Sequence, residues 1–129
     1  MILLDTHVIV WLQREPRKLS RAAESAIRRA QLGNGLAVSA AALVELAGLL
    51  SRGRVRTTGT VEWTLRELVA GIRIVPVTIE IAAATAYLPS DFPSDPMDRI
   101  IAATAQAEGL PLVTADQRIL RCSFLKTIW

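Results

Sequence analysis

The sequence predicts an α/β fold in which a mostly parallel sheet of about five strands is covered by helices on both faces. Two observations support this prediction. Short apolar runs of strand length alternate with longer segments of helical periodicity from one end of the chain to the other. The apolar runs are almost unbroken by polar residues, which is typical of strands that are buried on both faces of a parallel sheet.

Length and composition indicate one globular domain. The chain has 129 residues, of which 51% are hydrophobic, and it contains no internal repeat or linker, so we expect residues 1–129 to form a single domain. Cys122 is the only cysteine, which excludes an intramolecular disulfide and favours a reducing compartment. Because the sequence has neither a signal-peptide pattern nor an apolar stretch of membrane-spanning length, we expect a cytoplasmic protein with no membrane association.

The first half of the chain begins with a strand, and its helices are marked by capping residues. Ser20 and Thr60 precede helical patterns in the N-cap position, and Gly33 and Gly53 follow the ends of two helices. We therefore predict strands at 2–4 and 36–40, and helices, with their caps, at 6–13, 20–33, 41–53 and 60–71.

The second half of the chain continues the alternation. Thr78 is the expected N-cap of one helix, and Gly109 is the expected end of the next. We predict strands at 72–77, 111–115 and 125–129, helices at 79–87 and 96–108, and a short helical turn at 116–120.

The helix at 96–108 begins with the sequence DPMDR. Asp95 suits the N-cap position, Pro96 suits the first helical position, and Asp98 lies in the first turn, where a carboxylate is favoured by the helix dipole. Capping alone would explain both acids, so this stretch by itself leaves open whether either of them has a chemical role.

Three further acids occupy positions that capping explains less well. Asp5 and Asp116 each follow an apolar strand, at the carboxyl edge of the sheet where α/β proteins place their sites, although each could also cap the next helix. Glu45 lies in the middle of an apolar helix, where an ionised carboxylate is costly unless it is paired or binds a metal. If these acids meet Asp98, four carboxylates would repel one another unless they shared a cation.

The cation expected at such a site is Mg²⁺ or Mn²⁺. Hard divalent cations prefer carboxylate oxygens, and the chain offers no cluster of His or Cys for a softer metal. With four acids in the pocket, the rest of the chain would carry 15 Lys and Arg residues against eight acids. An acidic pocket in a basic surface suits a polyanionic substrate that is held near a metal ion.

Three segments, in their order along the chain, resemble the PIN-domain ribonucleases and specifically the VapC-type toxins of toxin–antitoxin pairs. These segments are LLDTHVIVWL, SAAALVELAGLL and SDPMDRIIAATAQAEGLPLVTAD. The resemblance implies a PIN-like α/β/α sandwich. It also implies an endoribonuclease that depends on Mg²⁺ or Mn²⁺ and hydrolyses RNA phosphodiester bonds with metal-activated water.

The resemblance also assigns roles to the acids. It implies that Asp5, Glu45, Asp98 and Asp116 are the catalytic and metal-binding residues, and that Asp95 is the helix cap. The partners that it implies are an RNA substrate and an antitoxin protein that covers the site, and we expect the chain to form a homodimer.

The antitoxin would need an apolar surface beside the acidic pocket. Leu46, Leu49 and Leu50 lie on the same helix as Glu45, and we expect them to provide a groove for an antitoxin helix or strand. An Arg of the antitoxin could bridge two carboxylates and replace the cation.

Three polar residues close to the acids in sequence are weaker candidates for the site. The hydroxyls of Thr6 and Thr114 could orient a ligand, a water or a phosphate, but these residues could also be ordinary caps. Arg99 could contact a phosphate or simply lie on an exposed helix face. For the aromatic residues we expect structural roles: His7 is outside the site, and Trp11 and Trp63 lie in the core or in an interface.

Two other functions are compatible with parts of this pattern. A non-catalytic PIN-like binding subunit would share the fold, but it would be expected to lack one or more of the four carboxylates. A phosphatase of the haloacid dehalogenase type also places an Asp after an apolar strand, but it needs a second Asp two residues later, where this chain has His7.

Overall fold

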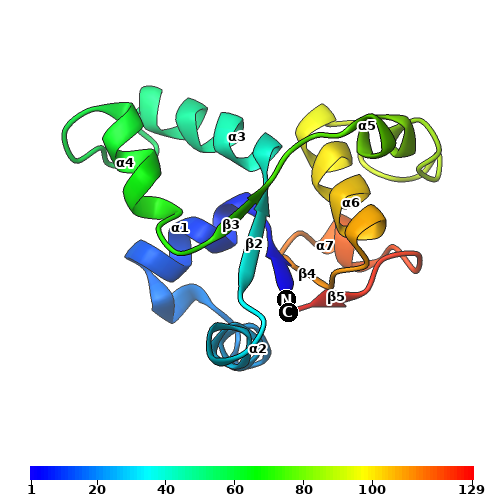
Figure 1. Ribbon diagram of the computed structural model, residues 1–129, viewed down its shortest axis with the longest axis horizontal. Helices are drawn as coiled ribbons and strands as arrows, with labels where there is room; N and C mark the ends of the chain where they lie inside the picture. The colour runs from blue at the N-terminus through cyan, green and yellow to red at the C-terminus, as the bar shows by residue number, and fades with distance from the viewer.

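The computed structural model describes residues 1–129 and shows a five-stranded parallel sheet between two sets of helices (Figure 1). All four strand pairings are parallel, as the sequence predicts. The strands are β1 (Ile2–Leu4), β2 (Leu36–Ser39), β3 (Arg73–Val75), β4 (Leu112–Val113) and β5 (Thr127–Ile128).

The order of the strands determines where a site can form. The sheet has the order β3-β2-β1-β4-β5, so the chain first builds outward from β1 through β2 to β3 and then returns to the other side of β1 for β4 and β5. In sheets of this kind, a crevice opens beyond the carboxyl ends of the two strands at which the order reverses. Here those strands are β1 and β4, which lead to Asp5 and Asp116.

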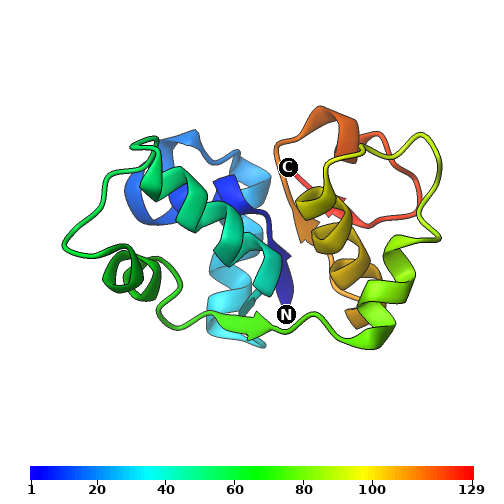
Figure 2. The same cartoon turned by 90° about the horizontal axis from the view of Figure 1, so that it is seen from above.

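The helices pack on both faces of the sheet. They are α1 (Thr6–Arg14), the 3₁₀ turn η1 (Pro16–Lys18), α2 (Arg21–Leu32), α3 (Ala40–Ser51), α4 (Val61–Leu68), α5 (Ile79–Thr85), α6 (Pro96–Glu108) and α7 (Gln117–Leu120). Helices α2 and α6 both contact β2 and lie on opposite sides of the sheet in Figure 1. Figure 2 shows the pairs α3–α4 and α5–α6 at the two ends of the molecule. No helix is long and apolar enough to cross a membrane.

Most helix boundaries agree with the capping signals in the sequence. The side chains of Ser20, Thr60 and Thr78 each accept a hydrogen bond from a backbone N–H in the first turn of the following helix. Helix α6 runs from Pro96 to Glu108 as predicted, and it ends at Gly109 with a φ of 65°, a left-handed conformation that glycine adopts without strain. These boundaries depend on local hydrogen bonds, which is why the sequence predicts them.

Strands β2 and β3 are shorter than predicted, each for a local reason. Strand β3 ends at Val75 because Pro76 has no N–H to donate to the neighbouring strand. Strand β2 ends at Ser39, whose hydroxyl accepts from the Ala41 backbone N–H and so begins α3 one residue earlier than expected.

The burial of α3 corrects one prediction from the sequence. Leu46 and Leu50 are 0% and 4% exposed and belong to the hydrophobic core, so they do not form the groove that we expected for an antitoxin. The exposed large apolar side chain on α3 is Val44, at 63%. Trp63, which we expected in the core or in an interface, is 58% exposed on α4. Because α3 is apolar on nearly all sides, its sequence pattern does not identify the side that is buried.

Candidate functional site

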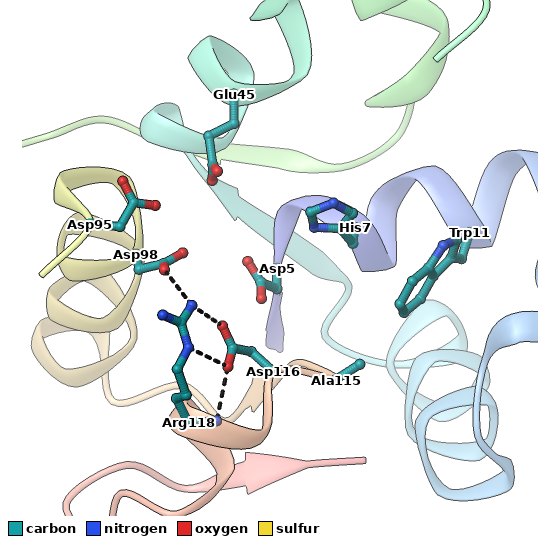
Figure 3. A pocket seen from close by; sticks show the side chains of 9 residues that line it. All are labelled: Asp5, His7, Trp11, Glu45, Asp95, Asp98, Ala115, Asp116 and Arg118. Atoms are coloured by element: carbon teal, nitrogen blue, oxygen red, sulfur yellow. Dashed lines mark hydrogen bonds and ion pairs between the residues drawn. The ribbon is translucent and has the colours of Figure 1, made fainter. Parts of the chain in front are cut away.

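An acidic pocket lies beyond the carboxyl ends of β1 and β4 (Figure 3). Its cavity has a volume of about 400 Å³, which is within the usual range for ligand pockets. The residues that line it are Asp5, His7, Trp11, Glu45, Asp95, Asp98, Ala115, Asp116 and Arg118. The structure therefore brings together all four acids that the sequence indicates, from four separate elements of the chain.

Asp5 has both of its carboxylate oxygens fixed. It is the N-cap of α1, where Oδ1 accepts a hydrogen bond of 2.8 Å from the Thr6 backbone N–H. Oδ2 accepts a bond of 2.7 Å from the hydroxyl of Thr114, which lies directly after β4. Capping and lining the pocket are thus not alternatives for Asp5, because one carboxylate does both.

Glu45 extends into the pocket from α3 and is held by Thr6. The Thr6 hydroxyl donates a hydrogen bond of 2.7 Å to Glu45 Oε1, while the backbone N–H of the same residue binds Asp5. Burial raises the pKa of Glu45, the hydrogen bond from Thr6 opposes this rise, and the negative charges of Asp5 and Asp95 add to it. Thr6 and Thr114 are 1% and 0% exposed, so in this structure their hydroxyls orient carboxylates.

Asp98 has the most strongly perturbed acid–base equilibrium in the pocket. The pKa of its carboxyl is raised to about 7. Burial is the largest cause, followed in decreasing order by the negative charges of Asp95, Asp5, Glu45 and Asp116. The carboxyl is therefore about half protonated at neutral pH when no cation offsets these charges.

Asp95 lies at the N-cap of α6 as expected, but its side chain does not cap the helix. The side chain makes no capping hydrogen bond and lies in the pocket instead. One carboxylate oxygen each from Asp95, Glu45 and Asp98 lie within 4.8 Å of one another. Asp95 thus adds a fifth carboxylate to the pocket, and Pro96 at the first helical position lets α6 begin with one fewer unpaired N–H.

Asp116 is paired with a residue that the sequence analysis missed. Its Oδ1 accepts from the Arg118 backbone N–H at 2.9 Å, and its Oδ2 is 3.0 Å from Arg118 Nη2. These bonds to Arg118 lower the pKa of Asp116. The same Nη2 lies 3.7 Å from Asp98 Oδ2, too far for a hydrogen bond, so Arg118 extends toward Asp98 without neutralising it (Figure 3). An arginine two residues after an acid has many common roles, so its sequence position gives no signal of this contact.

Two aromatic residues that we expected outside the site also line the pocket. His7 and Trp11 project from the same side of α1, one helical turn apart, and their ring centroids are 6.0 Å apart. The available signal was the spacing of four residues, which places both rings on one face of α1.

Arg99 is the one candidate that the structure places away from the pocket. Its guanidinium donates hydrogen bonds to the backbone carbonyls of Thr85 and Pro93, at 3.0 and 3.4 Å, and lies over the ring of Phe92. Arg99 therefore connects α6 to α5 and to the segment between them.

The donor set suits a hard divalent cation. Every potential ligand in the cluster of Glu45, Asp95 and Asp98 is a carboxylate oxygen, and burial together with the neighbouring carboxylates raises the pKa of Asp98. Asp5 lines the same pocket with its orientation already fixed. These acids fit Mg²⁺ or Mn²⁺ by their chemistry, and no nitrogen or sulfur ligand is needed.

Comparisons with known proteins agree with this geometry. The family model of the PIN domain matches residues 2–125. Ribonuclease VapC22 from Mycobacterium tuberculosis is 43% identical over 118 residues, which cover 92% of this chain and 88% of that protein.

Two solved structures share the fold. VapBC2 from Rickettsia felis, bound to a DNA fragment from the promoter, has a TM-score of 0.75 at 19% identity and covers 98% of this chain and 97% of its own. VapBC-5 from Mycobacterium tuberculosis, a member of the VapBC family of toxin–antitoxin systems, has a TM-score of 0.61 at 22% identity, with coverage of 98% and 94%.

The raised pKa of Asp98 predicts an unusual dependence of stability on pH in the absence of divalent cations. The pKa of this carboxyl is about 7 in the folded protein and near the ordinary 3.8 in the unfolded chain. Between these values the folded state binds more protons than the unfolded state, so the free energy of unfolding should fall as the pH rises from about 4 to about 7. Urea titrations in EDTA at several pH values would measure this fall.

The variant Asp98→Asn should remove most of that fall. Its neutral amide should make the protein about 1–2 kcal/mol more stable than the wild type at pH 8, once solvent screening of a half-buried carboxyl is allowed for. The exposed Asp91 lies outside the pocket, and Asp91→Asn is the matched control. Equal pH profiles for the wild type and Asp98→Asn would contradict the assignment.

Proposed function

This chain belongs to the PIN-domain family, and we propose that it is a metal-dependent endoribonuclease that acts as the toxin of a toxin–antitoxin pair. The observation that carries the proposal is the meeting of five carboxylates in one pocket at the carboxyl ends of β1 and β4. The 43% identity to a ribonuclease over most of both chains supports the activity. The likeness to VapBC toxin–antitoxin structures supports an inhibitory partner. In this proposal the protein acts in the cytoplasm, on RNA, as a single domain.

The acids would hold Mg²⁺ or Mn²⁺ against the scissile phosphodiester. Glu45, Asp95 and Asp98 are the closest group, and Asp5 completes the set from the end of β1. When bound, such a cation would supply positive charge for the phosphoryl oxygens and for the leaving ribose oxygen, and would lower the pKa of the attacking water. Cation binding favours the ionised form of Asp98, because its proton competes for the same oxygen.

The other residues of the site fix these acids or contact the substrate. Thr6 and Thr114 hold Asp5 and Glu45 through short hydrogen bonds, so the ligands do not need to reorganise when the cation binds. The Arg118 side chain is 63% exposed at the rim of the pocket. Its guanidinium binds Asp116 and lies 3.7 Å from Asp98, so at this rim its remaining N–H groups would donate to a phosphate oxygen of the RNA.

The two alternatives are less well supported. A non-catalytic binding subunit would not need to retain all four predicted acids in one pocket, together with the threonines that orient two of them. A haloacid-dehalogenase-type phosphatase needs a second Asp where this chain has His7, and the chain matches the PIN family model instead.

The partner surfaces require a revised assignment. Val44 is the exposed apolar residue next to Glu45, and we propose that the antitoxin packs against α3 around Val44 rather than on the buried leucines.

For the homodimer, Ile79 on α5 is 85% exposed and Tyr87 just beyond α5 is 86% exposed, and strand β3 is an edge of the sheet. Exposed apolar side chains and an unpaired strand edge are both features that suit contact with a second copy of the chain.

Divalent cations should stabilise the folded protein, and Arg118 should compete with them. A ligand that binds only the native state raises stability by about 2.7 kcal/mol at 100 times its Kd, so millimolar Mn²⁺ should raise the Tm measured in EDTA by several degrees. Arg118→Gln removes the guanidinium from the two acids that it contacts and should lower the Kd for Mn²⁺ by about 2- to 5-fold in calorimetric titration.

The matched control for Arg118→Gln is Arg121→Gln, since Arg121 is exposed on the next turn and does not line the pocket. It should bind Mn²⁺ as the wild type does. A wild-type protein whose Tm is the same in EDTA and in Mn²⁺ would count against the metal site.

Cleavage of single-stranded RNA in Mn²⁺ tests the function directly. Asp98→Asn should reduce cleavage by about 100-fold or more, and Thr6→Val, which removes only the hydroxyl that orients Glu45, should reduce it by about 10- to 100-fold. Because Asp95 lies in the carboxylate cluster, Asp95→Asn should also reduce cleavage, although Asn is as good an N-cap as Asp. Asp91→Asn is the control and should remain fully active; a wild-type protein that cleaves no RNA would favour the binding-subunit alternative.

Expression in cells tests the partner. Expression of the chain alone should stop growth, and co-expression of the protein encoded immediately upstream should restore it. Asp98→Asn should be harmless and should still bind that protein, because the surface around Val44 is unchanged. Val44→Glu should remain toxic and should no longer be rescued, since an ionised side chain would enter an apolar contact. Rescue of Val44→Glu at the wild-type level would show that the antitoxin binds elsewhere.

A further inference from the structure

The pocket has an aromatic side as well as an acidic side. His7 and Trp11 line it from α1, and Figure 3 shows both rings on the opposite side of Asp5 from Asp95 and Asp98. His7 is exposed and Trp11 is partly exposed, so both rings are open to a ligand in the pocket. We call these two side chains the aromatic wall.

Two uncharged side chains, those of Trp129 and Ala115, are neighbours of the aromatic wall. The Trp11 ring is supported from behind by Trp129, with centroids 5.6 Å apart and planes inclined by 51°. Ala115 lines the pocket near the aromatic wall with only a methyl group. This part of the pocket therefore offers the flat faces of an indole and an imidazole, whereas the acidic part is lined by carboxylates and by the Arg118 guanidinium.

A single RNA strand has the same two-part chemistry. Its phosphates require positive charge, which a cation among the acids would supply, and its unpaired bases stack on aromatic side chains. We propose that the aromatic wall is a subsite for one unpaired nucleobase of the nucleotide next to the phosphodiester that is cut. This inference rests on the ribonuclease function proposed above and extends it to the state of the substrate: single-stranded RNA or a loop, in which the base is free to leave its helix.

The alternative is that Trp11 only fills space between α1 and Trp129. The exposed His7 separates the two cases, because an exposed ring without a ligand contributes little to folding, whereas a stacking ring contributes to substrate binding. Trp11→Phe is informative for the same reason, since it keeps an aromatic face and most of the packing volume.

The experiment uses RNA from which one base has been removed. The bond that the wild-type protein cuts in a single-stranded RNA is first mapped in Mn²⁺, and the RNA is then made with an abasic ribose at each nucleotide that flanks this bond. One of these substitutions should lower kcat/KM for the wild type by about 5- to 150-fold, the range expected for the loss of one stacked base. A duplex of the same sequence should be a poor substrate.

The protein variants complete a double-mutant cycle. On intact RNA, Trp11→Ala should lose a similar factor, His7→Ala a smaller one, and Trp11→Phe should retain most of the activity. On the critical abasic RNA, the wild type and Trp11→Ala should be equally fast, because the stacking interaction is absent from both reactions. Trp63→Ala is the matched control, since Trp63 is exposed on α4 outside the pocket, and it should behave as the wild type.

The outcomes separate this inference from the function on which it rests. If the wild type cuts no RNA, the proposed function fails and the nucleobase subsite fails with it. If the wild type cuts intact and abasic RNA equally well, or if Trp11→Ala and His7→Ala slow both RNAs by the same factor, only the subsite is refuted and the rings are structural.

Discussion

The repulsion among five carboxylates in one pocket is the constraint on which the rest of this structure depends. A polypeptide gains nothing in stability by collecting acids at the edge of a buried sheet, and the raised pKa of Asp98, caused first by burial and then by the neighbouring carboxylates, reflects this cost. The fold tolerates this cost because the acids lie on a rigid framework. Strands β1 and β2 are fully buried, and 30 buried hydrophobic residues form one core around them.

The pocket contains acids of two kinds, which differ in how they are held. Asp5 and Asp116 lie at the N-termini of α1 and α7, accept backbone hydrogen bonds there and take part in further bonds with Thr114 and Arg118. These hydrogen bonds satisfy the carboxylate oxygens, so these two positions retain a carboxylate at little cost. Glu45, Asp95 and Asp98 have fewer compensating contacts, and it is this group that lies close enough to share a cation. The two acids that cap helices thus shape the pocket. The three acids with fewer hydrogen bonds supply its affinity for a cation.

The two sides of the pocket give the proposed enzyme two different requirements of its substrate. The acidic side requires an anion together with a divalent cation, which any nucleic acid with its metal satisfies. The aromatic wall adds a requirement for an unpaired base, which a regular duplex does not satisfy without breaking a pair. The preference for single-stranded over double-stranded RNA would then come from α1. The first residue of this helix, Thr6, also orients Glu45. Helix α1 therefore carries both the rings proposed to bind the base and the hydroxyl that orients Glu45.

The sequence by itself determined the features that depend on local hydrogen bonds and on periodicity. Caps such as Ser20 and Thr60, the limits of α6 and the alternation of parallel strands with helices are all visible in it, because each involves neighbours in the chain or a repeating pattern. It also indicated four acids of the pocket, each for a different reason. Asp5 and Asp116 follow apolar strands and so lie at the sheet edge, and Glu45 is a lone acid in an apolar helix. Asp98 was indicated only by the resemblance to the PIN-domain ribonucleases. Only the tertiary structure decided which side of an apolar helix is buried, as for Leu46 and Val44, because that depends on what packs against it. The tertiary structure alone also placed Asp95 in the carboxylate cluster and Arg118 between Asp98 and Asp116. These contacts depend on how α3, α6 and α7 pack around the sheet, which the local sequence does not specify.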